Sequence, residues 1–141
     1  MIWRINMEWN DNVYELWMLL NVAMLNQAVW FAACAFLIWV GFRFTNNIYN
    51  ASTTPMLAKV LTTAFCLSVA MFTLNTFMQV GSTVQGIGEA FSLLADTGVE
   101  LSAGAQNIVS RVGGAMVLPV QWVFIVSVVV MQLAQIWMKK S

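Results

Sequence analysis

Hydrophobic runs of bilayer length dominate this chain, and short polar stretches separate them. No charged residue lies between Glu15 and Arg43 or between Arg111 and Lys139, and a third apolar run extends from residue 60 to residue 80. About 20 predominantly apolar residues are enough for a helix to cross the hydrocarbon core of a membrane. The pattern therefore predicts three transmembrane helices, over residues 16–42, 57–80 and 116–138.

In the segment 87–112, apolar residues and polar residues each recur at helical spacing, and they occupy opposite faces of the predicted helix. Its apolar face consists of Ile87, Phe91, Leu94, Leu101, Ile108, Val109 and Val112, with Gly98 and Ala105 beside them. Its polar face consists of Glu89, Asp96, Glu100 and Asn107. Because three acids at mid-membrane would be costly, the segment is predicted to be one amphipathic helix rather than a fourth span. Its apolar face can pack on partner helices or lie on the membrane surface, and the acidic face favours packing on protein because it has the wrong sign for anionic lipid.

The composition agrees with a membrane protein. Of the 141 residues, 60% are hydrophobic and only 9% are charged, against roughly 25% charged residues in an ordinary soluble domain. A small soluble domain needs a polar surface, because it has much surface for its volume. The chain is therefore predicted to be an all-α integral membrane protein, with residues 1–141 forming a single membrane domain.

The positions of the basic residues predict an orientation. Arg43 and Lys59 flank the first connection, and Lys139 and Lys140 follow the third span. Bases in short loops favour the cytoplasmic side. The N-terminal segment and the connection 81–116 carry all six acids and only two bases. The prediction is a multi-pass protein with its N-terminus outside and its C-terminus in the cytoplasm.

Residue types that carry chemistry are scarce. The chain has no histidine, which removes the commonest zinc ligand and the imidazole ligand of haem. Cys34 and Cys66 lie in apolar runs and are interpreted as buried small hydrophobic residues. Asp96 and Glu100 lie one helical turn apart and are interpreted as a solvated helix face rather than an acid–base pair. Zero net charge gives no indication of a nucleic-acid partner. We therefore expect no enzyme activity, no cofactor and no metal site.

Polar residues inside the predicted spans form stripes at helical spacing. The stripes are Asn21, Ala28, Ala32 and Ala35 in the first span, Ser68, Asn75 and Gln79 in the second, and Gln121, Gln132 and Gln135 in the third. Amides in lipid seek hydrogen-bond partners, and small residues let helices approach closely. Two interpretations are open: helix–helix packing within or between subunits, which is the commoner use, and the lining of a water-filled pore.

These features favour a non-enzymatic structural or assembly subunit of a larger membrane-embedded complex. The partners would be the lipid bilayer and other membrane subunits, in a homo- or hetero-oligomer of a bacterial envelope machine or a phage or virion membrane. One alternative is a pore former, because small phage holins resemble this layout of three spans with a basic C-terminal tail, although the 87–112 segment and the short tail depart from it. The other alternative is a small accessory subunit of an energy-converting complex.

Overall fold

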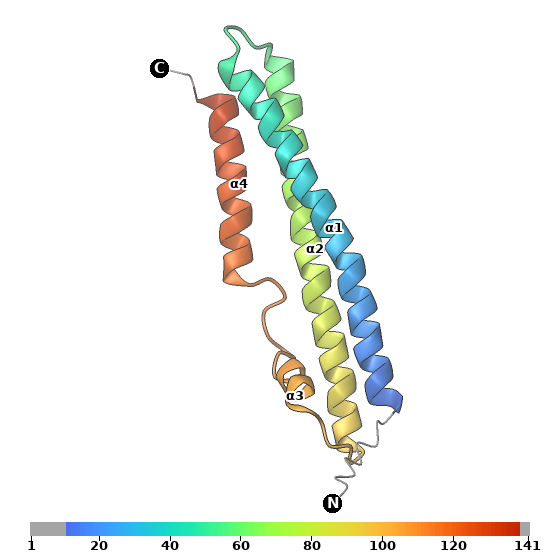
Figure 1. Cartoon of the computed structure of the whole chain (residues 1–141). Helices are drawn as coiled ribbons and strands as arrows, with labels where there is room; N and C mark the ends of the chain where they lie inside the picture. The colour runs from blue at the N-terminus through green and yellow to red at the C-terminus, as the bar shows by residue number, and fades with distance from the viewer. Residues whose placement is uncertain (1–10, 139–141) are drawn as a thin grey trace, which may run out of the picture.

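Four helices and no strand make up residues 11–138, the part of the chain that this computed structural model describes. They are α1 (Asp11–Asn50), α2 (Met56–Asp96), α3 (Ala103–Val109) and α4 (Pro119–Trp137). The helices α1 and α2 form a long antiparallel hairpin (Figure 1). The short helix α3 packs on α2 near the open end of the hairpin, and α4 lies along the half of the hairpin that is nearest its connecting loop (Figure 1).

The lengths of three helices suit a membrane. With 40 and 41 residues, α1 and α2 are each about 60 Å long, twice the hydrocarbon thickness of about 30 Å. With 19 residues, α4 is about 28 Å long and matches one crossing. All three are long and apolar enough to cross a membrane, by length and composition. The prediction of three apolar helices is confirmed, although α1 and α2 run well beyond the predicted spans 16–42 and 57–80.

The helix α2 continues where the sequence predicts a weakening, at Gly81 and Gly86. At Gly81 the segment that leads into α4 crosses α2 so closely that a Cβ atom would lie 2.3 Å from the carbonyl oxygen of Met116. Glycine permits such a close backbone approach. This glycine is therefore a packing feature of the helix rather than its end.

The prediction of one amphipathic helix over 87–112 is wrong. Its first ten residues belong to α2, and the chain then turns before α3 begins at Ala103. Gly98 has a φ of +90°, and its N–H donates to the carbonyl of Ala95 at 2.9 Å. This left-handed glycine after the last helical residues is a common way to end a helix. The Ser102 hydroxyl then accepts the N–H of Ala105 at 3.3 Å and caps α3.

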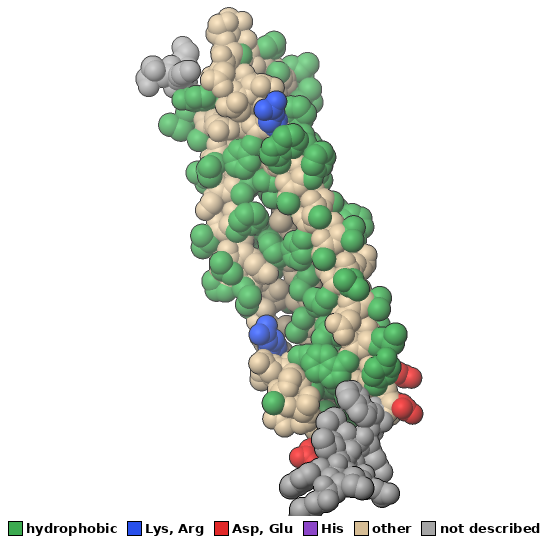
Figure 2. All heavy atoms as spheres, in the orientation of Figure 1, with side chains coloured by type: hydrophobic (Ala, Val, Ile, Leu, Met, Phe, Trp, Pro, Cys, Tyr) green, Lys and Arg blue, Asp and Glu red, His purple; other side chains and the backbone are tan. Residues whose placement is uncertain are grey.

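The bundle buries several polar residues beside apolar ones, and it exposes many large apolar side chains. The buried polar residues are Gln27, Thr45, Thr73, Thr76 and Gln132. Large apolar side chains cover much of the outer surface (Figure 2), and they include Leu25 and Met71, which are 70% and 72% exposed. A soluble protein of this size would rarely expose so many large apolar side chains.

Charged residues gather toward the two ends of the hairpin. Arg43 and Lys59 flank the α1–α2 connection, and the Lys59 ammonium lies 5.7 Å from the centre of the Trp137 ring at the end of α4. Acidic side chains lie at the opposite end (Figure 2). The α1–α2 connection and the end of α4 therefore share one end of the bundle.

Candidate helix-packing surfaces

A seam of small and polar residues holds the three long helices together. In α1 the buried residues are Gln27, Cys34, Gly41 and Thr45. The first three are spaced by seven residues, which is the repeat that keeps one helix face against its neighbours in a coiled coil. This face lies apart from the predicted stripe of Asn21 and three alanines. The exposed stripe has the same seven-residue spacing at Asn21, Ala28 and Ala35, so the spacing alone does not identify the buried face.

In the corresponding seam of α2, the threonine hydroxyls form hydrogen bonds within their own helix. Its buried residues near the middle of the bundle are Cys66, Val69, Thr73 and Thr76. The hydroxyls of Thr73 and Thr76 donate to carbonyl oxygens one turn earlier, at 2.8 and 3.0 Å. A threonine bonded in this way can be buried without an unpaired donor. The seam therefore packs closely at little polar cost.

Two glutamines of α4 attach this helix to α1. The side-chain amide of Gln132 is 2% exposed and donates to the carbonyl oxygen of Ile38 at 3.3 Å. The Gln135 oxygen accepts the hydroxyl of Thr45. Both glutamines belong to the predicted third stripe. Its remaining member, Gln121, instead accepts the backbone N–H of Leu118 at 2.7 Å, so it caps α4 and does not join two helices.

Gln27 is the exception in the seam, because its buried side-chain oxygen has no hydrogen-bond partner in the structure. The residue is 8% exposed. An unsatisfied buried polar group costs about 1–3 kcal/mol. Gln27 therefore opposes the stability that the other seam residues provide.

Replacing Gln27 by leucine is expected to leave the free energy of unfolding unchanged or to raise it by up to about 2 kcal/mol, because the change removes an unpaired acceptor at similar volume. Thermal unfolding in detergent measures the effect. Gln132→Leu is the matched control, since it removes an amide that is hydrogen-bonded, and it is expected to lower the melting temperature. A marked loss of stability in Gln27→Leu would show that the amide has a partner.

The predicted stripe of α2 faces away from the bundle. Ser68, Asn75 and Gln79 are all exposed. The Ser68 hydroxyl is satisfied by the carbonyl of Ala64 at 2.8 Å. The side chains of Asn75 and Gln79 form no hydrogen bond with any residue in 11–138. They stand among exposed apolar neighbours such as Met71 and Met78.

The predicted stripe of α1 also faces outward. Asn21, Ala28, Ala32 and Ala35 are exposed. The Asn21 side chain donates to the carbonyl of Trp17 at 3.0 Å, within the same helix. These residues therefore do not pack the helices of one chain together, because the Gln27–Thr45 face is turned inward instead. Their contact with another subunit stays a prediction.

The predicted partner face of 87–112 is largely covered by the chain itself. Ile87, Phe91 and Ala105 form a buried cluster at the open end of the hairpin. The partly buried residues packed on it are Val13, Leu16, Trp17 and Leu20 of α1, together with Leu101, Ile108 and Val109. Leu94 and Val112 are half-buried, and Val112 lies against Gly88. Because the chain reverses at Gly98, the two halves of the face pack against each other, with α1 side chains beside them.

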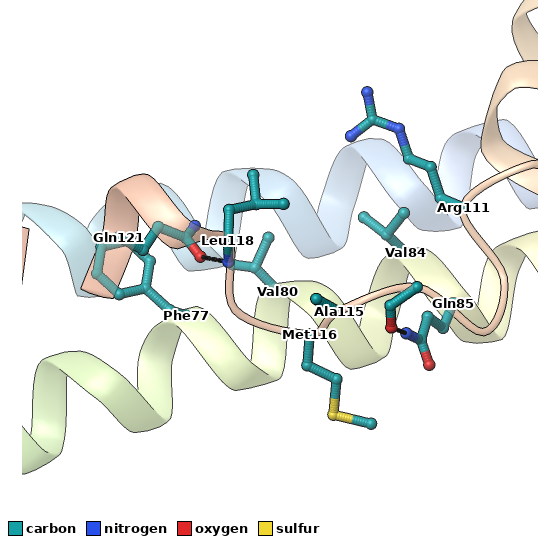
Figure 3. Close-up of a pocket in the computed structure, with 11 residues that line it drawn as sticks. Phe77, Val80, Val84, Gln85, Arg111, Ala115, Met116, Leu118 and Gln121 are labelled. Carbon is teal, nitrogen blue, oxygen red and sulfur yellow. Dashed lines mark hydrogen bonds between the residues drawn. The ribbon is translucent and has the colours of Figure 1, made fainter. Parts of the chain in front are cut away.

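A groove with a volume of about 390 Å³ lies between α2 and the segment that leads into α4. Its walls include Phe77, Val80 and Val84 of α2 (Figure 3). The segment is held in place by the Gln85 amide, which donates to the carbonyl of Gly114 at 2.8 Å (Figure 3). Arg111 lines one end of the groove.

Within the described residues no group of three or more His, Cys, Asp and Glu side chains is placed to bind a metal ion. Cys34 and Cys66 are free thiols buried in the seam. The Cys34 sulfur lies 3.7 Å from the Thr76 hydroxyl, as a packing contact between α1 and α2. Cys34 therefore contributes to the packing of α1 on α2.

No protein-family model matches this chain, and no curated protein or solved structure is significantly similar to it.

Proposed function

We propose that the chain is an integral membrane protein in which α1, α2 and α4 cross the bilayer, and that it serves as a non-enzymatic structural subunit of a larger membrane complex. One observation carries the assembly role. Nearly all polar side chains in the seam inside the bundle have a hydrogen-bond partner. Asn75 and Gln79, in contrast, present amides on the apolar outer face of α2 that are unpaired among the described residues. An amide that faces hydrocarbon gains from a partner on another helix.

Membrane insertion is supported by the apolar outer surface and by helix lengths. The orientation that follows from the basic residues puts the α1–α2 connection and the C-terminus in the cytoplasm and the turn at Gly98 outside. Retention in the pellet after alkaline carbonate extraction tests insertion. Single cysteines at Ser52 and Glu100, in a chain whose native cysteines are replaced by serine, test orientation by their reaction with a membrane-impermeant maleimide. Labelling of Ser52→Cys in intact cells would contradict the proposed orientation, because the α1–α2 connection would then lie outside.

The amide stripe is expected to contribute measurable association energy. Hydrogen bonds between membrane helices contribute about 0.6 kcal/mol on average and up to about 2 kcal/mol. Two amides that each exchange hydrogen bonds with another subunit are therefore worth about 1–3 kcal/mol. Because 1.4 kcal/mol corresponds to a factor of ten, their loss is expected to raise the dissociation constant of the oligomer about 5- to 140-fold.

The double variant Asn75→Leu/Gln79→Leu tests this contribution. Subunit association is measured by energy transfer between labelled chains at decreasing protein-to-lipid ratio. The helix content and melting temperature of the monomer are expected to stay unchanged, because neither amide forms a hydrogen bond with residues 11–138. Met71→Leu, on the same exposed helix, is the control and is expected to associate like the unaltered chain. Equal association of the double variant would contradict the assembly role of the stripe.

The same stripe also favours a second candidate, a holin-like pore. If several copies turned Ser68, Asn75 and Gln79 toward a common axis, these groups would line a polar path through the membrane. Release of a small dye from liposomes that contain the protein separates the two functions. A pore requires leakage that the double leucine variant abolishes, whereas a structural subunit leaves the liposomes tight in both forms.

A further inference from the structure

Two hollows meet at Arg111. The first is the 390 Å³ groove between α2 and the segment before α4. The second, of about 320 Å³, lies between α1, α2 and α3, where Trp17 and Leu20 form part of its wall. Val84 and Arg111 line both hollows. Arg111 therefore lies at the junction of two largely apolar depressions.

Arg111 has no hydrogen-bond or ion-pair partner among the described residues, and its side chain is exposed. The two other basic side chains of this range flank the opposite end of the hairpin, where Arg43 lies 5.9 Å from the Trp39 ring and Lys59 lies over Trp137. A guanidinium offers a rigid fork of donors that fits two oxygens of a phosphate. An unpaired arginine in this position favours a phosphate-bearing ligand.

The walls beside Arg111 suit a hydrocarbon chain. Arg111, Val84, Val80 and Leu118 point to the same side of the crossing segment in Figure 3. From Val84 to Phe77 the apolar wall of α2 extends about 11 Å at 1.5 Å per residue. It runs toward Pro119, where the bilayer-length helix α4 begins. With α4 crossing the bilayer as proposed, the groove starts near the hydrocarbon boundary and leads toward the hydrocarbon.

We infer that this groove is a phospholipid site. Arg111 binds the phosphodiester of the head group, the side-chain amide of Asn107 at the edge of the second hollow supplies a further donor, and one acyl chain lies along Val84, Val80 and Phe77. The inference rests on the proposed membrane insertion. The ligand is a membrane phospholipid rather than free phosphate, because the apolar wall adds nothing to the binding of a bare anion.

Native mass spectrometry of the full chain in detergent, titrated with dioleoyl phosphatidylglycerol, tests the site. One lipid is expected to bind in preference to further, weaker adducts. Arg111→Gln is expected to weaken its binding about tenfold or more, because charge-assisted hydrogen bonds are lost. Arg43→Gln removes an exposed base at the other end of the bundle and is expected to bind lipid like the unaltered chain.

Blocking variants separate a built groove from general attraction between arginine and head groups. Val84→Phe fills the junction of the two hollows while Arg111 remains, and Ala115→Leu narrows the groove from the crossing segment. Each is expected to weaken lipid binding several-fold with unchanged helix content. Unaltered binding in both well-folded variants, or an equal loss in Arg43→Gln, would overturn the site.

Two further probes distinguish the source of the phosphate. Dioleoylglycerol, which has the same acyl chains without phosphate, is expected to bind weakly, and glycerol phosphate alone is expected not to compete. Equal binding of dioleoylglycerol, or full competition by glycerol phosphate, would overturn a phospholipid site. Loss of the protein from membranes in carbonate would instead contradict membrane insertion, so the two failures are distinguishable.

Discussion

Replacing Phe91 by alanine is expected to lower the free energy of unfolding by about 3–5 kcal/mol, the usual cost of deleting a fully buried aromatic ring. Phe91 is 0% exposed and lies in the cluster with Ile87 and Ala105. Its ring centre is 5.4 Å from that of Trp17 on α1. Because α3 has only seven residues and cannot form a stable helix alone, removing the ring is expected to release α3 from the hairpin.

Limited proteolysis and thermal unfolding in detergent measure this effect. Cleavage in the segment 97–102 is expected to become faster, because α3 holds this segment against the bundle. Leu93→Ala is the matched control: it truncates a large apolar residue two positions away that is 69% exposed, and it is expected to change stability by less than about 0.5 kcal/mol. Similar cleavage rates in the two variants would show that the cluster does not hold α3.

The number and approximate position of the apolar helices follow directly from the sequence. Each long run without charge encodes a helix, because only a hydrogen-bonded backbone can lie in an apolar surrounding. The continuation of α2 beyond residue 80 is not evident from the sequence, because Gly81 and Gly86 normally mark a weak point in a helix. The contact between Gly81 and the crossing segment is a tertiary feature, and nothing local in the sequence reveals it.

The turn at Gly98 shows why a helical period alone misleads. Residues 87–96 and 101–112 keep the same phase, since both halves bury their apolar side chains in one cluster on α1. A chain that reverses between them has the same angular pattern as one straight helix. The signals that distinguish the two are local: a glycine in position to end α2 and a serine in position to cap α3.

The candidate surfaces were predicted only in part, because the prediction weighted amides over small hydroxyl residues. Gln132 and Gln135 do join α4 to α1. In α2 the inner seam instead consists largely of Thr73, Thr76 and Cys66, whose side chains are short enough for close packing. Longer amides such as Asn75 then remain outside. Which polar stripe turns inward depends on the fit of three helices, and a single helix does not contain that information.

Replacing Gly81 by alanine is expected to displace the segment before α4 and to lower the free energy of unfolding by about 2 kcal/mol, within the usual range for overpacking a close contact. The new methyl group would lie 2.3 Å from the Met116 oxygen and 2.8 Å from its Cα. Both are backbone atoms, so no side-chain rotation relieves the clash. The segment must move, and the α4 start and the groove beside Arg111 are expected to move with it.

Gly86→Ala separates this clash from the helix preference of alanine, because a Cβ at Gly86 meets no atom within 4 Å. Since alanine is favoured over glycine inside an exposed helix by up to about 1 kcal/mol, Gly86→Ala is expected to raise the melting temperature while Gly81→Ala lowers it. Proteolysis within 110–118 is expected to speed up only in Gly81→Ala. Two glycines five residues apart in one helix would then act with opposite sign, one as a contact that the fold requires and the other as a position where the helix gains from a side chain. If both variants gained stability, the crossing segment would not lie against α2.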